Sequence, residues 1–175
     1  MRTLIAFLLA SLSALAAPMV VVSVPEQRMA LVDNGARLAQ FPVSTSKFGL
    51  GDRPGSYRTP LGTMEVAAKI GAHAPLGAEF KHRRLTGKIL KPNAPGRDSI
   101  VTRILQLRGL DRCNAAAFDR GIYIHGTAAE RKIGRPASYG CIRMRSLDVV
   151  RLFDAVAVGT RVAVLNAPLA NACGR

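Results

Sequence analysis

Tryptophan is absent from this chain of 175 residues, and only three tyrosines and six phenylalanines are present. So few rings exclude a core built on large aromatic side chains, and Val, Ile, Leu and Ala must fill it instead. Apolar residues make up 49% of the chain and charged residues 21%, a balance that excludes a disordered chain. A chain of this length is expected to form one domain and is too short for two independent cores.

Apolar runs long enough for a comfortable membrane span are also missing. The run from Leu4 to Ala16 has about thirteen residues, whereas a spanning helix needs roughly 20. Its length, and the positive charge of Arg2 before it, are typical of a secretory signal peptide. We therefore predict a signal peptide at residues 1–16, a single mature domain at 17–175, and export to the periplasm or cell-wall space. An uncleaved membrane anchor is the alternative.

Acidic residues are scarce: 11 Asp and Glu stand against 25 Lys and Arg, for a net charge of +14. Such a balance indicates polyanionic partners rather than a particular fold. Nucleic acid is the usual partner, but no recognisable nucleic-acid-binding module is present, so we expect none. An exported protein first meets wall peptides with free carboxylates and acidic lipid headgroups. The basic stretch from Lys81 to Lys91 is either a solvated face or a surface for peripheral contact with the anionic envelope.

Cysteine is limited to Cys113, Cys141 and Cys173, and the chain contains neither Cys-x-x-Cys nor His-x-x-x-His. These absences argue against a zinc site, and we expect no metal and no cofactor. An oxidising compartment would allow two of the three cysteines to pair, and whether they do stays open on the sequence. Cys113 and Cys173 lie in Asn- and Ala-rich segments and are the candidates for a disulfide, which would leave Cys141 as a free thiol.

The apolar pattern predicts a mainly β domain with one helix. Asn34-Gly35 favours a tight hairpin turn between strands at 28–33 and 36–44. The helix is expected to begin at Ser146 as its N-cap and to end at Gly159. Its core-facing stripe would be Leu147, Val150, Phe153 and Ala157. Other strand-like runs are 19–24, 63–70, 100–107, 121–124 and 161–165, with a long loop near the site at 46–60 and a basic loop at 71–99.

Residues suited to covalent chemistry gather between Tyr123 and Met144. His125 ends an apolar strand, and Cys141 follows sixteen positions later, after Gly140. An adjacent imidazole raises the thiolate fraction of a cysteine, and the backbone N–H groups of residues 139, 140 and 141 would stabilise an oxyanion. On the residues alone, two interpretations stay open: a catalytic Cys/His pair, or a buried structural Cys beside a surface His.

Two motifs, His125-Gly126-Thr127 and Ser138-Tyr139-Gly140-Cys141-Ile142-Arg143-Met144, resemble the signature of the L,D-transpeptidase catalytic domain, also called the YkuD-type domain. The resemblance spans about residues 25–165, because segments 27–31, 42–45 and 58–62 also follow the family's pattern. Tyr139 departs from that pattern, since the family usually has His before the Gly-Cys. This departure leaves the substrate preference and the tuning of the thiol open, and an inactive homologue is the alternative.

The resemblance implies a β-sandwich or barrel of mixed strands, with one helix flanking the sheet after the catalytic Cys. It also implies a peptidoglycan L,D-transpeptidase, a target of carbapenems, that needs no cofactor. In this interpretation Cys141 attacks the peptide bond after the third residue of a wall tetrapeptide and releases D-Ala. His125 takes the thiol proton, and the Gly126 carbonyl orients its ring.

The resemblance further suggests which residues hold the substrate. Arg143 would bind a substrate carboxylate, unless it is a surface residue paired with Asp148. Tyr123, Ser138 and Tyr139 would line the pocket, with simple packing as the alternative for the two tyrosines. An amine acceptor from a second stem peptide would give a cross-link, and water would give L,D-carboxypeptidase trimming. A non-catalytic, basic wall-binding protein is the alternative from another functional class; in either case we expect a monomer.

Overall fold

The computed structural model describes residues 17–96 and 98–171. The predicted signal peptide and Cys173 of the predicted disulfide lie outside these residues. Ten strands and one α-helix, α1, occur among them, which confirms a mainly β chain with one helix near its C-terminus. The elements are β1 (Met19–Ser23), β2 (Arg28–Asp33), β3 (Ala36–Pro42), β4 (Gly62–Ile70), β5 (Ala78–Lys81), β6 (Arg84–Ile89), β7 (Ile100–Gly109), β8 (Tyr123–Thr127), β9 (Ile142–Met144), α1 (Ser146–Ala155) and β10 (Arg161–Leu165).

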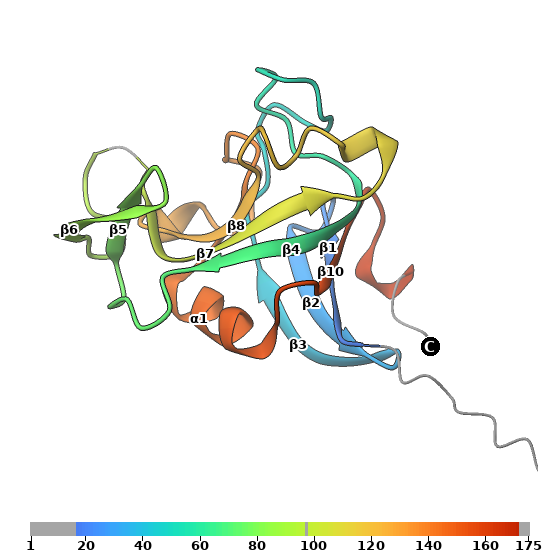
Figure 1. Ribbon diagram of the computed structural model, residues 1–175, viewed down its shortest axis with the longest axis horizontal. Coiled ribbons are helices and arrows are strands. Elements are labelled where there is room, and N and C mark those ends of the chain that lie inside the picture. The colour runs from blue at the N-terminus through green and yellow to red at the C-terminus, as the bar shows by residue number, and fades with distance from the viewer. Residues whose placement is uncertain (1–16, 97, 172–175) are drawn as a thin grey trace, which may run out of the picture.

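The ten strands form one mixed sheet that branches at β7 (Figure 1). Its order is β3-β2-β1-β10-β4-β7; β7 then pairs with β5, which leads to β6, and also with β8, which leads to β9. The pairs β1–β10 and β8–β9 are parallel, and the other pairs are antiparallel. Val20 of β1 and Met29 of β2 share a buried cluster with Ile142 of β9, at the other end of the sheet, and with Leu152 of α1. The sheet therefore encloses one main core, which α1 completes.

Most of the predicted strands are confirmed, including the hairpin of β2 and β3 around Asn34-Gly35. The prediction of a loop at 71–99 was wrong, because β5 and β6 form an antiparallel hairpin there. A tertiary partner explains the difference. Phe80 lies opposite Ile100 of β7, and its ring packs with Ala78 and Ile104 in a small second core. Every residue of β6 is exposed. Its sequence, Arg-Leu-Thr-Gly-Lys-Ile, therefore lacks the regular alternation of apolar and polar residues that would have indicated a strand.

The helix begins at Ser146 as predicted, but its buried face differs from the predicted one. Val149, Leu152 and Phe153 are buried, whereas Leu147 is 61% exposed. Ser146 is the first helical residue rather than the N-cap, and its N–H donates to Glu130 Oε1 (2.8 Å).

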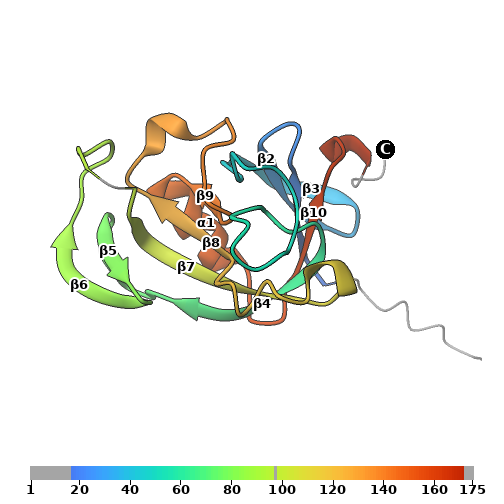
Figure 2. The ribbon, with the colours of Figure 1, turned by 90° about the horizontal axis from the view of Figure 1, so that it is seen from above.

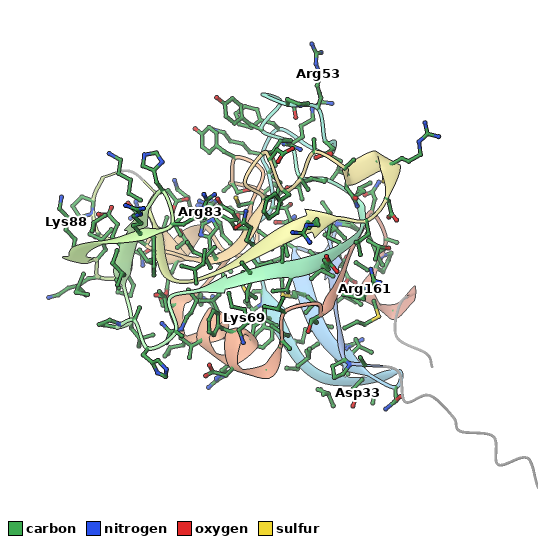
Figure 3. The ribbon with its side chains drawn as sticks, viewed as in Figure 1. Asp33, Arg53, Lys69, Arg83, Lys88 and Arg161 are labelled. Atoms are coloured by element: carbon green, nitrogen blue, oxygen red, sulfur yellow. The ribbon has the colours of Figure 1, made fainter. Side chains whose placement is uncertain are left out.

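The helix also ends at Ala155, four residues before the predicted stop at Gly159. There Lys69 Nζ donates to the carbonyls of Phe153 and Val156, both at 2.6 Å, and Figure 3 shows Lys69 beside α1. A cation at this end complements the helix dipole. Among the described residues, no helix is both long enough and apolar enough to cross a membrane.

Candidate active site

The parallel pairing of β8 with β9 brings together the segments that carry the two predicted catalytic residues, His125 in β8 and Cys141 directly before β9. Ile124 lies opposite Ile142 and His125 opposite Arg143, so Cys141 directly precedes the first paired residue of β9. Both isoleucines belong to the main core. Because side chains alternate along a strand, His125 and Arg143 point to the other face of the pair. Cys141, two residues before Arg143, starts on that same side.

His125 is buried, and its Nδ1 lies 2.8 Å from the Gly126 carbonyl. A carbonyl oxygen only accepts hydrogen bonds, so Nδ1 carries the proton and Nε2 keeps its lone pair. Burial lowers the pKa of His125 to about 4, although the bond to Gly126 acts in the opposite direction. The ring is therefore neutral at pH 7 and able to accept a proton at Nε2.

An irregularity in β7 explains why glycine follows this histidine. The β7–β8 register shifts between Val101 and Ile104, and Thr102 has φ +72°. Such bulges bend a strand and re-aim its neighbours. Here the bulge brings the Val101 carbonyl to 2.5 Å from the position that a Cβ on Gly126 would occupy. Only glycine fits at that position, and its own carbonyl is then placed against the His125 ring.

Cys141 is partly exposed, and its sulfur lies among backbone groups of the segment that leads into β8. Sγ donates to the Gly121 carbonyl at 3.4 Å and receives a hydrogen bond from the Tyr123 N–H. Burial raises the pKa of the thiol to about 11, while the Tyr123 bond and the positive charge of Arg120 lower it. The resting cysteine is thus a protonated thiol.

The turn before Cys141 is held by two hydroxyl groups. Ser138 Oγ donates to the Cys141 carbonyl (2.6 Å) and accepts from the Gly140 N–H (3.2 Å). Thr59 Oγ1 donates to the Gly140 carbonyl (2.9 Å). Ser138 is only 2% exposed, so it shapes the turn rather than lining a pocket as predicted. The Cys141 N–H makes no hydrogen bond within the described residues.

The loop at 46–60 runs beside this turn (Figure 2), with Ser46 bridged to Ser138. A buried ion pair anchors it: Arg120 Nη1 lies 2.7 Å from Asp52 Oδ1, with side chains 8% and 10% exposed. Arg120 also donates to the carbonyls of Gly51 (3.1 Å) and Arg58 (2.7 Å). Because Arg120 contacts this loop and its charge acts on Cys141, the pair links the loop to the thiol.

Arg143 is buried and takes part in neither of the pairings considered from the sequence. It forms an ion pair with Asp98, not with Asp148, and its Nη2 donates to Ser44 Oγ (3.0 Å). Burial lowers the pKa of Arg143 to about 10. Its Nε is buried without a hydrogen-bond partner. The guanidinium therefore forms part of the floor of a pocket rather than an open carboxylate site.

That pocket has a volume of about 360 Å³ and a strongly cationic lining. Four of its residues are basic and one, Asp98, is acidic. Low-dielectric walls with charges of one sign concentrate ligands of the opposite sign. The lining residues are Lys47, Asp98, Lys132, Arg135, Pro136, Ala137, Tyr139 and Arg143. Across the described residues, no group of three or more His, Cys, Asp or Glu is arranged to hold a metal ion.

The two predicted pocket tyrosines lie in different surroundings. Tyr123 is half-buried against the small second core, and its hydroxyl accepts a hydrogen bond from Arg83 Nη1 (3.3 Å); Arg83 is labelled in Figure 3. Tyr139 is 60% exposed, and its hydroxyl accepts from Lys47 Nζ (3.1 Å).

Sequence reasoning missed the roles of Thr59, Arg120, Asp52 and Asp98. Arg120 and Asp52 are 68 residues apart, and Asp98 and Arg143 come from segments that no local pattern connects. Thr59 lay within a family-like segment, but nothing local indicated its bond to Gly140.

Residues 17–164 match the L,D-transpeptidase catalytic domain family, YkuD. The Bacillus subtilis protein YkuD is 37% identical over 118 residues, which cover 63% of this chain and 70% of that protein. The Salmonella typhimurium protein ErfK/SrfK is 52% identical over 46 residues, 26% of this chain. This segment spans only 15% of the length of ErfK/SrfK.

Solved structures show the same fold. An L,D-transpeptidase from Mycobacterium tuberculosis H37Rv has a TM-score of 0.56 and 19% identity, over 85% of this chain and 57% of that one. The L,D-transpeptidase LdtMt1, solved in complex with imipenem, has a TM-score of 0.54 and 21% identity, over 85% and 59%. The likeness of fold agrees with the family match over nearly the whole described chain, and this protein therefore belongs to the L,D-transpeptidase catalytic domain (YkuD) family.

Proposed function

We propose that this protein is a peptidoglycan L,D-transpeptidase in which Cys141 is the nucleophile and His125 the general base. The observation that carries the proposal is the β8–β9 register, which sets Cys141 two residues from the position opposite His125. Family membership supports the substrate class, the stem peptides of the wall. The signal-like residues 1–16 support action in the periplasm or cell-wall space.

The resting pair is neutral, since burial disfavours both imidazolium and thiolate. Proton transfer therefore accompanies attack. The thiol proton passes to His125 Nε2 while Sγ bonds to the carbonyl carbon of the third stem residue. His125 then returns the proton to the amine of D-Ala as the C–N bond breaks, which leaves a thioester on Cys141. An incoming stem-peptide amine gives its proton to His125, attacks the thioester and restores the thiol.

The oxyanion formed during attack needs donors that are not already engaged. The Gly140 N–H donates to Ser138 Oγ, so we assign this role first to the Cys141 N–H. Gly140 has φ +118°, and a Cβ on it would lie 3.3 Å from the Arg58 carbonyl. Glycine there keeps the turn tight and the Cys141 N–H directed at the substrate.

The cationic pocket beside Tyr139 suits the carboxylates of a stem peptide. Arg143 is held by Asp98 and Ser44, so the outer cations Lys47, Lys132 and Arg135 would make the substrate contacts, with Arg143 fixing the floor. The exposed cations of the β5–β6 hairpin, such as Lys88 at its outer edge (Figure 3), would add peripheral attraction to the anionic envelope.

Digestion of purified tetrapeptide wall fragments, followed by mass spectrometry, tests the proposal. We expect release of D-Ala and a cross-linked dimer whose new bond joins the third residue to an amine. Tripeptide alone would identify L,D-carboxypeptidase trimming by the same acyl-enzyme. Unchanged fragments after incubation with folded protein would contradict an enzymatic role and favour the wall-binding alternative.

The lowered pKa of His125 predicts unusual tolerance of acid. A base must be unprotonated to act. The pH at which activity begins to fall on the acid side should therefore lie near the His125 pKa of about 4, well below the 6.5 of an ordinary histidine. The value of kcat/KM should stay nearly constant from about pH 5 to 8 and fall about tenfold per unit below about pH 4. NMR titration of the His125 ring gives the same midpoint independently. A midpoint near 6.5 would contradict the buried, neutral ring.

A further inference from the structure

Three exposed aromatic side chains form one cluster, although the chain has only nine aromatic residues. Phe48, Tyr57 and Tyr139 are 43%, 56% and 60% exposed. Their ring centroids lie 5.3–5.9 Å apart, and Lys47 Nζ lies 4.6 Å from the centroid of Tyr139. We call Phe48, Tyr57 and Tyr139 the aromatic platform. A chain so poor in rings places a third of them on one patch of its surface.

The aromatic platform borders the candidate active site. Tyr139 is two residues before Cys141, and the Tyr57 carbonyl lies 3.6 Å from the position that a Cβ on Gly140 would occupy. Phe48 and Tyr57 come from the loop that the Arg120–Asp52 pair anchors. Figure 3 shows Arg53, from the same loop, at the far side of the molecule from α1. Because Tyr139 and Tyr57 both lie next to the turn that ends at Cys141, a molecule bound on the platform would extend directly to a substrate at Cys141.

Backbone strain at Tyr57 argues that its exposed ring is there for binding. Tyr57 has φ +56°, a left-handed conformation that costs a non-glycine residue about 1 kcal/mol or more. Its carbonyl accepts from Ser46 Oγ (2.5 Å), which fixes this conformation. Asn or Gly would adopt the same backbone with less strain. Among the described rings, that of Tyr57 contacts only the other two of the platform, Phe48 and Tyr139, and Tyr57 stays 56% exposed.

We propose that the aromatic platform binds a sugar ring of the glycan strand that carries the donor stem peptide. This inference rests on the proposed function, because it extends the same site along its substrate. The scissile carbonyl is three residues from the sugar, roughly 10 Å in an extended chain. A residue two positions from Cys141 lies within roughly 7 Å, and its ring reaches further. The C–H face of a pyranose packs on aromatic rings, while phenol hydroxyls and Lys47 face its hydroxyl groups.

A bilayer surface is the other class of partner that aromatic and basic side chains favour. The position of the platform argues against it, because a bilayer lying on Phe48, Tyr57 and Tyr139 would cover the approach to Cys141. A sugar on the same rings would instead direct its stem peptide toward the sulfur.

Kinetics with and without the sugar test the inference. The ratio of kcat/KM for a disaccharide-tetrapeptide to that for the free tetrapeptide should be about tenfold in the natural chain. Phe48→Ala combined with Tyr57→Asn should bring this ratio close to one; Asn keeps the left-handed backbone and removes the ring. Tyr57→Phe should retain the preference. Phe118→Ala, which removes an exposed ring stacked under Arg108 elsewhere, is the matched control and should leave the ratio unchanged.

A ratio near one in the natural chain, or an unchanged ratio in the double variant, would overturn the inference. If neither substrate turns over, the proposed function has failed, and direct binding still tests the platform. Two of the three tyrosines lie in it and tryptophan is absent, so tyrosine fluorescence should respond to the stem-free disaccharide and lose that response in the double variant. No response in the natural chain would contradict sugar binding. Platform-dependent sedimentation with phosphatidylglycerol vesicles, without a response to sugar, would assign the platform to lipid.

Discussion

Replacing His125 with Ala is expected to slow acylation of Cys141 by imipenem about 10³-fold while the protein stays folded. The natural chain should gain one covalent adduct, visible by intact mass, because the proposed nucleophile Cys141 would attack the β-lactam carbonyl as it attacks a stem-peptide carbonyl. The loss follows from the high pKa of the thiol, about 11. Without a base at Nε2, very little thiolate forms at neutral pH, and a positioned base contributes typically 10²- to 10⁴-fold.

Two cysteine variants control this measurement. Cys141→Ala should show no adduct, whereas Cys113→Ser, which removes the other described thiol, should react as the natural chain does. Near-normal acylation of His125→Ala would show that another group takes the proton. Retained structure is expected because the removed ring faces away from the main core that holds Ile124 and Ile142.

Replacing Arg120 with Ala should lower the free energy of unfolding by about 3–5 kcal/mol. The substitution leaves the Asp52 carboxylate buried with only the Ala116 N–H as a donor (2.6 Å), and an uncompensated buried charge is destabilising by this amount. Urea denaturation measures the change. Acylation should slow as well, since the loop carrying Thr59 loses its anchor and the Cys141 thiol loses a nearby positive charge.

The double variant Asp52→Asn with Arg120→Met separates the charge from the packing. Removing both charges while keeping similar volumes should restore most of the lost stability. It should not restore the acylation rate, because the hydrogen bonds from Arg120 to Gly51 and Arg58 are also gone. A loss below about 1 kcal/mol in Arg120→Ala would mean that water already solvates this pair.

Local sequence signals predicted the elements with strong patterns and missed those that depend on distant partners. The Asn34-Gly35 hairpin was predictable because turn chemistry is local. The β5–β6 hairpin was not, because Phe80 is fixed by β7 rather than by its own neighbours. The helix was found, but its buried face was misplaced by one position because both Leu147 and Val149 fit an apolar stripe. Only the packing on β7 and β8 decides between them.

The candidate site shows the same division. Short motifs were enough to nominate His125, Gly126 and Cys141 as catalytic candidates, because the chemistry of thiol and imidazole restricts which residues serve. Ser138 was misjudged, since its hydroxyl is used inside the turn. The pair of Asp98 with Arg143, and the aromatic platform, each assemble from two segments that are far apart in the sequence. Spacing along the chain carries no information about such assemblies.

The parallel pairing of β1 with β10 has a consequence for biosynthesis. Val20 lies opposite Val162, and β10 alone joins β1 to β4. Until the ribosome has released residue 165, the two halves of the sheet have no strand between them. Such long-range closure is slow compared with local folding. The nascent chain therefore cannot close this sheet until β10 has emerged from the ribosome.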